Sequence, residues 1–217
     1  MSAEDDNLSV AENLPSKDSQ VLCDASNIEK LLAFWFEHSE GIEKWFKLSL
    51  AVDVECKPWE PLVVAAQEGR LSSWSQSTDG TLALLLLMDQ LPRNIYRGTP
   101  RAYASDAQAL ATALDAIARG VDRQVPLERQ MFFYLPIMHH ESLLAQVGCL
   151  GLYQGMLARA EAGTDLHELL EGALGIAQLH VDVIRKFGRF PGRNVALGRA
   201  STTEETEYLK DKGPGGF

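Results

Sequence analysis

Two segments of the sequence share a short pattern of residues that can bind an anion. Residues 89–94 read Asp-Gln-Leu-Pro-Arg-Asn, and residues 187–194 read Phe-Gly-Arg-Phe-Pro-Gly-Arg-Asn. In both, an apolar residue and a proline end a predicted helix, and an Arg-Asn pair follows. The planar guanidinium group of arginine matches carboxylate and phosphate groups. The pattern therefore predicts a site for a small anion, and its candidate ligand-binding residues are Asp89, Gln90, Arg93, Asn94, Arg189, Arg193 and Asn194.

Basic residues are concentrated around both segments, although the chain as a whole is acidic. No acid lies between residues 185 and 199, and three arginines lie close together in residues 93–101. Neither stretch has the lysine density or interleaved aromatic residues of a nucleic-acid groove, which favours a small anion as the partner. A structural alternative stays open. The arginines can face the negative ends of helices, or pair with acids such as Asp89 and Asp182 in a polar core.

Two histidines and a glutamate are the candidate catalytic residues. His180 lies on the apolar stripe of a predicted helix, and His139 and Glu141 follow Pro136. Histidine is the side chain best suited to general acid or base chemistry near neutral pH. On a regular helix, residues two positions apart point about 200° away from each other. His139 and Glu141 are therefore not expected to hold one metal ion together, and we predict no metal site.

Other catalytic chemistry has no support in the sequence. The three cysteines form no CxxC pair, and no GxSxG motif, glycine-rich phosphate loop or GxGxxG fingerprint is present. Cys149 lies in a predicted apolar helix that carries several glycines, where a thiolate would be costly. We therefore expect neither a nucleophilic cysteine or serine nor a bound cofactor.

The segments that carry these residues have the period of helices. Apolar residues recur every three or four positions, and no stretch alternates as a strand with hairpin turns does. The predicted fold class is all-α, with about nine or ten helices joined by short connections. Ser201 and Glu204 are expected to form a capping box that starts the last helix. The predicted helical segments are 26–36, 45–67 with a break at Pro58 and Pro61, 81–91, 106–120, 126–135, 136–160, 164–187 and 201–212.

Several local features refine this description. Pro136 is expected to end or kink the helix that opens at Pro126, because proline removes one donor. Gly148, Gly151 and Gly155 lower the helicity of their segment, so a neighbouring helix is expected to pack closely against them. The aromatic residues expected in the core are Phe34, Trp35, Phe36, Trp45 and Phe46.

Composition bounds the remaining possibilities. The chain has 217 residues, of which 46% are hydrophobic and 23% are charged, and its net charge is -10. The charged residues of 1–26 are acidic except for Lys17, and few large apolar residues accompany them, which predicts a disordered tail. Residues 27–217 are expected to form a single domain. No signal peptide or membrane segment is recognisable, so a cytoplasmic location is expected, with no membrane partner. The negative charge disfavours nucleic acid as a partner.

Taken together, the motifs resemble a bacterial family catalogued as domain of unknown function number 924. The resemblance covers about residues 28–210, and it implies a fold similar to tetratricopeptide repeats, in which stacked antiparallel helix pairs form a superhelix with a concave face. It implies no reaction. The chain departs from the family pattern at Gly192, where a histidine is expected, and at His140, where a serine is expected. The segments that carry the resemblance are 32–36, 89–94, 97–102, 134–141, 187–194 and 197–202.

Two functions of different classes follow. In the first, the protein is a binding module whose arginines and asparagines hold a small anionic ligand or a peptide carboxylate. In the second, it is an enzyme in which His139 or His180 acts as general acid or base and the arginines stabilise negative charge. The first is favoured. Both require the two Pro-Arg-Asn segments to lie side by side, so Arg93 and Arg193 are predicted to be close in space.

Overall fold

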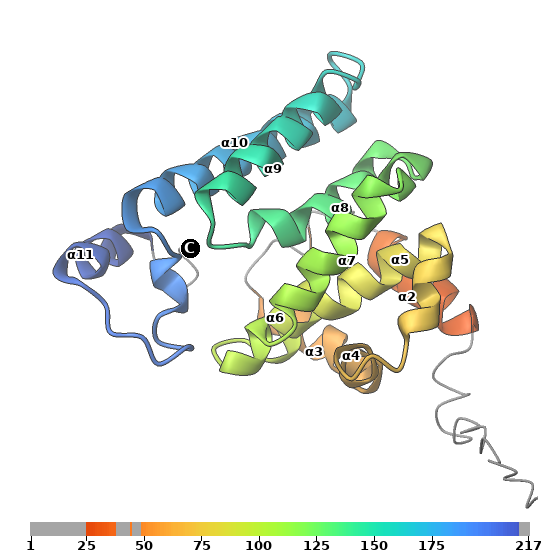
Figure 1. The fold of residues 1–217 in the computed structure, drawn as a ribbon, viewed down its shortest axis with the longest axis horizontal. Helices are drawn as coiled ribbons and strands as arrows, with labels where there is room; N and C mark the ends of the chain where they lie inside the picture. The colour runs from red at the N-terminus through yellow and green to blue at the C-terminus, as the bar shows by residue number, and fades with distance from the viewer. Residues whose placement is uncertain (1–24, 38–43, 45–48, 213–217) are drawn as a thin grey trace, which may run out of the picture.

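The protein is built from α-helices, short 3-10 turns and one π-helical turn, which confirms the predicted all-α class (Figure 1). The structure is a computed structural model that describes residues 25–37, 44 and 49–212, and these residues contain no strand. The helices are α2 (Ala25–Phe36), α3 (Leu50–Cys56), α4 (Glu60–Gln67), α5 (Thr78–Leu85), α6 (Leu91–Ile95), α7 (Asp106–Ala118), α8 (Leu127–Met138), α9 (Leu143–Leu157), α10 (Asp165–Phe187) and α11 (Thr203–Lys212).

The main core surrounds α5 and the π-helical turn that continues it, Leu86–Gln90. Every residue from 80 to 92 is buried, as expected for a helix with an apolar surface on all sides. Helices α2, α7 and α8 pack against α5, and α4 packs against the π turn. Trp35 of α2 is completely buried, as predicted for the aromatic residues, whereas Trp45 and Phe46 lie outside the described residues.

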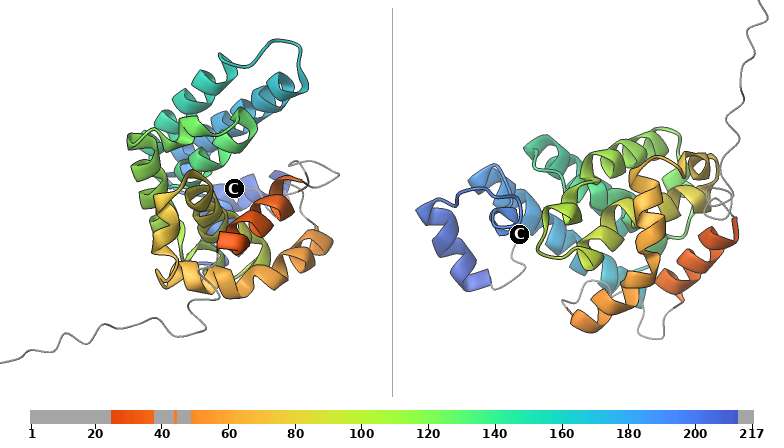
Figure 2. Two further views of the ribbon diagram at one scale, coloured as in Figure 1. Left: turned by 90° about the vertical axis from the view of Figure 1, so that its right-hand side faces the viewer. Right: turned by 90° about the horizontal axis from the view of Figure 1, so that it is seen from below.

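Consecutive helices pack against each other in the second half of the chain. Helix α7 contacts α8, α8 contacts α9, and α9 lies along α10 in a long hairpin (Figures 1 and 2). Such contacts between successive helices agree with the expected architecture, and the likeness to a tetratricopeptide superhelix stays a prediction. None of the helices in the described residues combines the length and the apolar character needed to cross a membrane.

The C-terminal segment has a small apolar cluster of its own. Helix α10 ends at Phe187, and Gly188 follows as its cap, with a φ of 69° that is a left-handed conformation glycine adopts readily. A 3-10 turn, η7 (Pro191–Arg193), and then α11 follow, and α11 lies beside the end of α10, away from the main core (Figure 1). The cluster consists of Val183, Ile184, Phe187, Phe190 and Tyr208. Polar contacts therefore have a large share in holding this segment to the body of the protein.

The capping box of α11 lies one residue later than predicted. The Thr202 hydroxyl accepts the backbone N–H of Glu205, and the Glu205 carboxylate accepts the backbone N–H of Thr202. Glu204 instead pairs with Lys186 at 3.1 Å. Ser201 and Thr202 offer equivalent hydroxyl groups in sequence, but in the structure Ser201 accepts from Asn194, and Arg189 binds the Glu205 carboxylate of the capping box.

The structure corrects the expected helix end at Pro136 and the expected close packing of the α9 glycines. Pro136 does not end its helix, because α8 continues to Met138 with the proline inside it, and the alternative of a kink stays a prediction. The helix ends after Met138, and residues 139–142 form a non-helical connection before α9 begins. The three glycines of α9 face no close neighbour, since a Cβ added at Gly148, Gly151 or Gly155 would meet no atom within 4 Å.

Gly80 is the glycine that close packing requires. A Cβ at this position would lie 2.2 Å from the backbone oxygen of Trp74, in the turn that precedes α5. We expect Gly80→Ala to lower the free energy of unfolding by about 1–3 kcal/mol, because backbone must move. The matched control is Gly148→Ala, which should raise it by about 0.5–1 kcal/mol through helix propensity alone. Urea denaturation of both variants measures the two effects, and a neutral Gly80→Ala would show that α5 shifts at no cost.

Candidate functional site

The first Pro-Arg-Asn segment lies inside a helical stretch, which corrects the predicted post-helix turn. Helix α5, the π turn and α6 run on without a break from Thr78 to Ile95. Pro92 lies at the start of α6, directly after the π turn, so its missing N–H falls where the hydrogen-bond pattern changes from π to α. The Ser105 hydroxyl donates to the Met88 backbone oxygen at 2.6 Å. The π turn places Asp89 and Gln90 in the protein interior, and π turns are frequent at functional sites.

Asp89 and His139 form a buried pair. The Nδ1 atom of His139, at the end of α8, lies 2.7 Å from Oδ1 of Asp89. The Asp89 side chain is 1% exposed, and Gln90 donates to its other oxygen. Burial alone would raise the pKa of Asp89, but His139 and Arg93 more than offset this and lower it. The ionised carboxylate therefore holds the proton of neutral His139 on Nδ1.

The structure brings Arg93 and Arg193 together, as predicted, through a carboxylate that they share. Arg93 binds Asp106 in a bidentate pair at 2.9 and 3.1 Å, and Arg193 approaches the same carboxylate at 3.2 Å. Asp106 is the first residue of α7. Arg93 also donates to the Ala102 backbone oxygen and lies 3.4 Å from Asp89. Arg93 is therefore held by protein groups on several sides.

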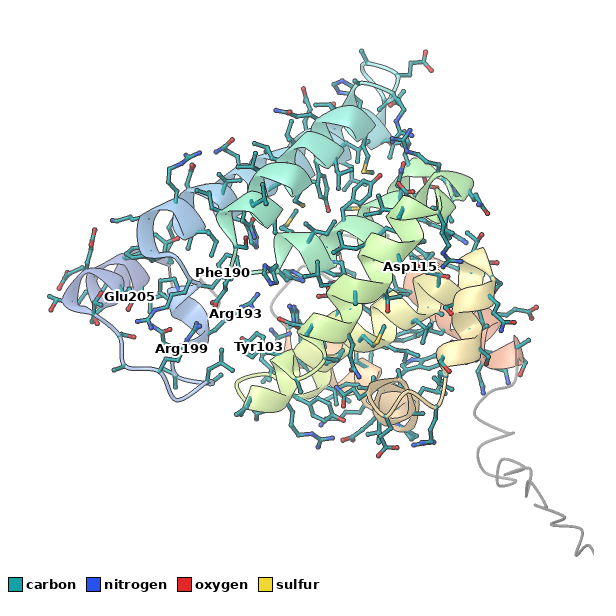
Figure 3. All side chains as sticks on the ribbon, in the orientation of Figure 1. Tyr103, Asp115, Phe190, Arg193, Arg199 and Glu205 are labelled. Carbon is teal, nitrogen blue, oxygen red and sulfur yellow. The ribbon has the colours of Figure 1, made fainter. Side chains whose placement is uncertain are left out.

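Arg193 has a weaker set of partners than Arg93. It donates to the His139 backbone oxygen at 2.8 Å, and its guanidinium group lies between the rings of Phe190 and Tyr103 (Figure 3). Its side chain is 12% exposed. Burial, together with the neighbouring positive charge of Arg93, lowers the pKa of Arg193. Asp89 and Asp106 outweigh burial at Arg93 and raise its pKa. Arg193 is thus the guanidinium group of this pair whose charge the protein compensates less.

His180 lies next to this group but is bonded to its own helix. Its Nδ1 atom lies 2.9 Å from the Ile176 backbone oxygen, and its ring centre is 6.3 Å from that of His139. The ring also packs edge-on against Phe190. Burial lowers the pKa of His180 to about 3. His180 is therefore a neutral residue in the wall of the site.

Glu141 serves a different partner from His139. Its carboxylate binds Arg199 in a bidentate pair at 2.7 and 3.0 Å and accepts the backbone N–H of Phe190 at 2.7 Å. Because α8 ends at Met138, His139 and Glu141 lie in the non-helical connection to α9. Their side chains point to different partners for this reason and not because of the rotation of a helix. Glu141 connects the α8–α9 junction to the C-terminal segment and so helps to hold Arg193 in place.

The remaining predicted residues lie around this group and not within it. Arg189 binds Glu205 at 2.7 and 2.8 Å, and Asn194 donates to Ser201 and Glu205. Asn94 donates to the Gln90 backbone oxygen and accepts from Arg97. Asn94 thus contacts backbone of its own helical stretch, and Asn194 contacts side chains of the C-terminal segment.

Sequence reasoning missed three residues of the site: Asp106, Tyr103 and Phe190. The acids considered as partners of Arg193 were Asp89 and Asp182, but Asp182 pairs with Arg185 at the surface of α10. Asp106 carries no local signal beyond its place at the start of an amphipathic helix. Tyr103 contacts Arg193 from a 3-10 turn that is distant in sequence, and Phe190 contacts it from three residues earlier in the same segment.

We name the group formed by Asp89, Arg93, Asp106, His139 and Arg193 the arginine–histidine cluster. It combines a guanidinium group that can bind an anion with a histidine whose tautomer is fixed by a buried carboxylate, the arrangement used for general acid–base chemistry. Among the described residues, no three His, Cys, Asp or Glu side chains converge as metal ligands. Burial raises the pKa of Cys149 to about 12, so this thiol is not a nucleophile at neutral pH.

Comparison with known proteins extends the sequence resemblance to the fold. The model of a bacterial protein family of unknown function, DUF924, matches residues 31–213. The solved structure of a protein of unknown function from Agrobacterium tumefaciens is 36% identical to this chain, with a TM-score of 0.74. The match covers 86% of this chain and 98% of that protein. No curated protein matches significantly.

Proposed function

The chain belongs to the bacterial family of unknown function DUF924, and on this premise we propose that it binds a small anionic ligand or a peptide carboxylate at Arg193. The observation that carries the proposal is the sharing of one carboxylate by two arginines. Arg93 occupies both oxygens of Asp106 and also faces Asp89 at 3.4 Å, so the two carboxylates of this group compensate the charge of Arg93 more than that of Arg193. An anion beside Arg193 would relieve its repulsion from Arg93.

Two further features support the same function. The rings of Phe190 and Tyr103 hold the guanidinium group of Arg193 in one orientation, which reduces the entropy lost when it binds a carboxylate or phosphate group. Its side chain keeps 12% exposure, so it is accessible from solvent. A bound anion would therefore meet an arginine that is already positioned.

Arg193→Ala tests this function through thermal stability. We expect the variant to unfold within about 2 °C of the parent, because Arg93 still neutralises Asp106. An anion at about 100 times its dissociation constant should raise the melting temperature of the parent by about 5–10 °C, and this rise should be lost in the variant. Thermal-shift measurements across sulfate, phosphate and a panel of small carboxylates provide both numbers.

Arg185→Ala is the matched control, because it removes one exposed arginine of α10 whose partner is Asp182. Its response to anions should equal that of the parent. Strong destabilisation by Arg193→Ala, combined with no anion response in the parent, would contradict the proposal and leave a structural network of ion pairs.

A second candidate function is catalysis by His139 as general acid or base. What favours it is the 2.7 Å contact with Asp89, because a carboxylate at Nδ1 leaves Nε2 as the atom that exchanges a proton. His180 is the weaker candidate of the two, since its ring is bonded to a backbone oxygen in its own helix. Turnover distinguishes the two functions. Each anion that stabilises the parent is incubated with the protein and then analysed for a product: a product indicates an enzyme, and an unchanged anion indicates a binding protein.

A further inference from the structure

The charges of the arginine–histidine cluster and its surroundings are balanced when both histidines are neutral. Arg93 and Arg193 face Asp89 and Asp106, Arg199 is paired with Glu141, and Arg189 is paired with Glu205. Four guanidinium groups thus meet four carboxylates. An anion that enters this neutral and largely buried environment adds an uncompensated negative charge, which is costly away from water.

His139 is the group in the cluster that can supply the missing positive charge. Its Nδ1 position is occupied by Asp89, and protonation at Nε2 turns the ring into a donor on both sides. Its own backbone oxygen accepts from Arg193, and the charge of Arg193 also acts on the imidazole group, so His139 adjoins the arginine proposed to bind the anion. Burial, with Arg93, lowers the pKa of His139 in the free protein, so the ring is neutral before an anion binds.

Charged and titratable groups face His139 from several elements around the end of α8, whereas α9 contacts this end through Gln146, which carries no charge. The π turn contributes the negative charge of Asp89, and helix α10 contributes His180, which is neutral. Arg93 of helix α6 and Arg193 of the turn η7 contribute positive charges. Asp106 of helix α7 contributes a negative charge, and it is paired with both arginines. The charged groups in question are Asp89, Arg93, Asp106 and Arg193.

We propose that the arginine–histidine cluster takes up its anion together with one proton, and that His139 carries this proton. The inference rests on the proposed anion site at Arg193 and adds its coupling to pH. The anion attracts the imidazolium form of His139, while Asp89 already accepts from Nδ1. Binding is then tighter at lower pH, because the bound state holds one proton more than the free state.

Isothermal titration calorimetry with sulfate and with acetate measures this coupling directly, since both ions stay fully charged near neutral pH. Titrations in two buffers with different ionisation enthalpies give the number of protons taken up per anion, which we expect to approach one. The affinity for sulfate should fall about tenfold per unit of pH between pH 6.5 and 7.5. The experiment uses the full chain.

His139→Gln assigns the proton to its residue. Glutamine can still donate to Asp89 but cannot take a proton, so binding by this variant should no longer depend on pH in this interval. The matched control is His140→Gln, which changes the exposed neighbouring histidine and should keep the pH dependence of the parent. Nitrogen chemical shifts of His139 in the parent, with and without saturating sulfate, report the same protonation without any substitution.

The outcomes separate this inference from the function on which it rests. Sulfate and acetate binding without proton uptake would overturn the inference and leave the anion site intact. Proton uptake that persists in His139→Gln would also overturn it, because another group would then carry the proton. If neither ion binds the parent at any pH between 5.5 and 7.5, the anion site itself is wrong and the coupling falls with it.

Discussion

Asp89→Ala is expected to lower the free energy of unfolding by about 3–5 kcal/mol, because it removes one member of a buried ion pair. Asp89 is 1% exposed, and it accepts from both His139 and Gln90 while lying 3.4 Å from Arg93. Without the carboxylate, the amide of Gln90 and the Nδ1–H of His139 lose their acceptor in the interior. Urea denaturation at pH 7 measures the loss.

Asp182→Ala is the control for this change, since Asp182 is paired with Arg185 on the exposed side of α10. An exposed pair of this kind contributes at most about 1 kcal/mol. Asp89→Asn should lie between the two, because an amide oxygen still accepts from His139 but carries no charge. If Asp89→Ala and Asp182→Ala cost the same, water reaches Asp89 and the cluster is not a buried network.

His180 should make the protein less stable in mild acid. The unfolded chain protonates this histidine below about pH 6.5, whereas the folded protein does so only near pH 3, so the unfolded state binds more protons in between. Stability due to His180 is therefore fully present above pH 6.5 and is lost as the pH falls toward 3. The total loss is about 4–5 kcal/mol, of which about 2 kcal/mol falls between pH 6.5 and 5.

The measurement compares the parent with His180→Phe, which keeps a ring beside Phe190 but has no group to protonate. Urea denaturation at pH 6.5 and pH 5 should show the parent losing about 2 kcal/mol more than the variant. The exposed His140→Gln variant should behave as the parent does. Equal losses in the parent and His180→Phe would mean that His180 is protonated in the folded protein.

Much of the fold follows from sequence because the signals for a helix, its apolar period and its end residues, lie within the helix itself. Three predicted segments correspond to helical stretches in the structure: the buried run 81–91, the amphipathic stripe 106–120 and the long helix 164–187. The errors occur where a local rule has two physical solutions. Pro136 permits a helix to continue when its missing donor is tolerated, and a glycine in a helix does not require a neighbour at its Cα.

The site was predictable only in part, for a similar reason. Matching chemistry in the two Pro-Arg-Asn segments predicted that Arg93 and Arg193 meet, and they do. The carboxylate that joins them is Asp106, and no motif spacing connects it to either arginine. Its contact with them depends on how α7 packs against the other elements of the site. Asn94 and Asn194 follow the arginines in sequence, but their side chains point to local backbone and acids.

The π turn at Leu86–Gln90 also bears on how the sequence can change. A π turn holds about one residue more than an α-helical turn, so the residues after it face differently from those of a regular helix of the same length. Each residue of an α-helix rotates the chain by about 100°. If Leu86–Gln90 instead formed regular α-helical turns, the residues that follow would be rotated by about 100° around the helix axis, which would turn Arg93 away from Asp106. The alignment of the cluster therefore depends on the π geometry of this turn, and a substitution that favoured a regular α-helical turn would disrupt it.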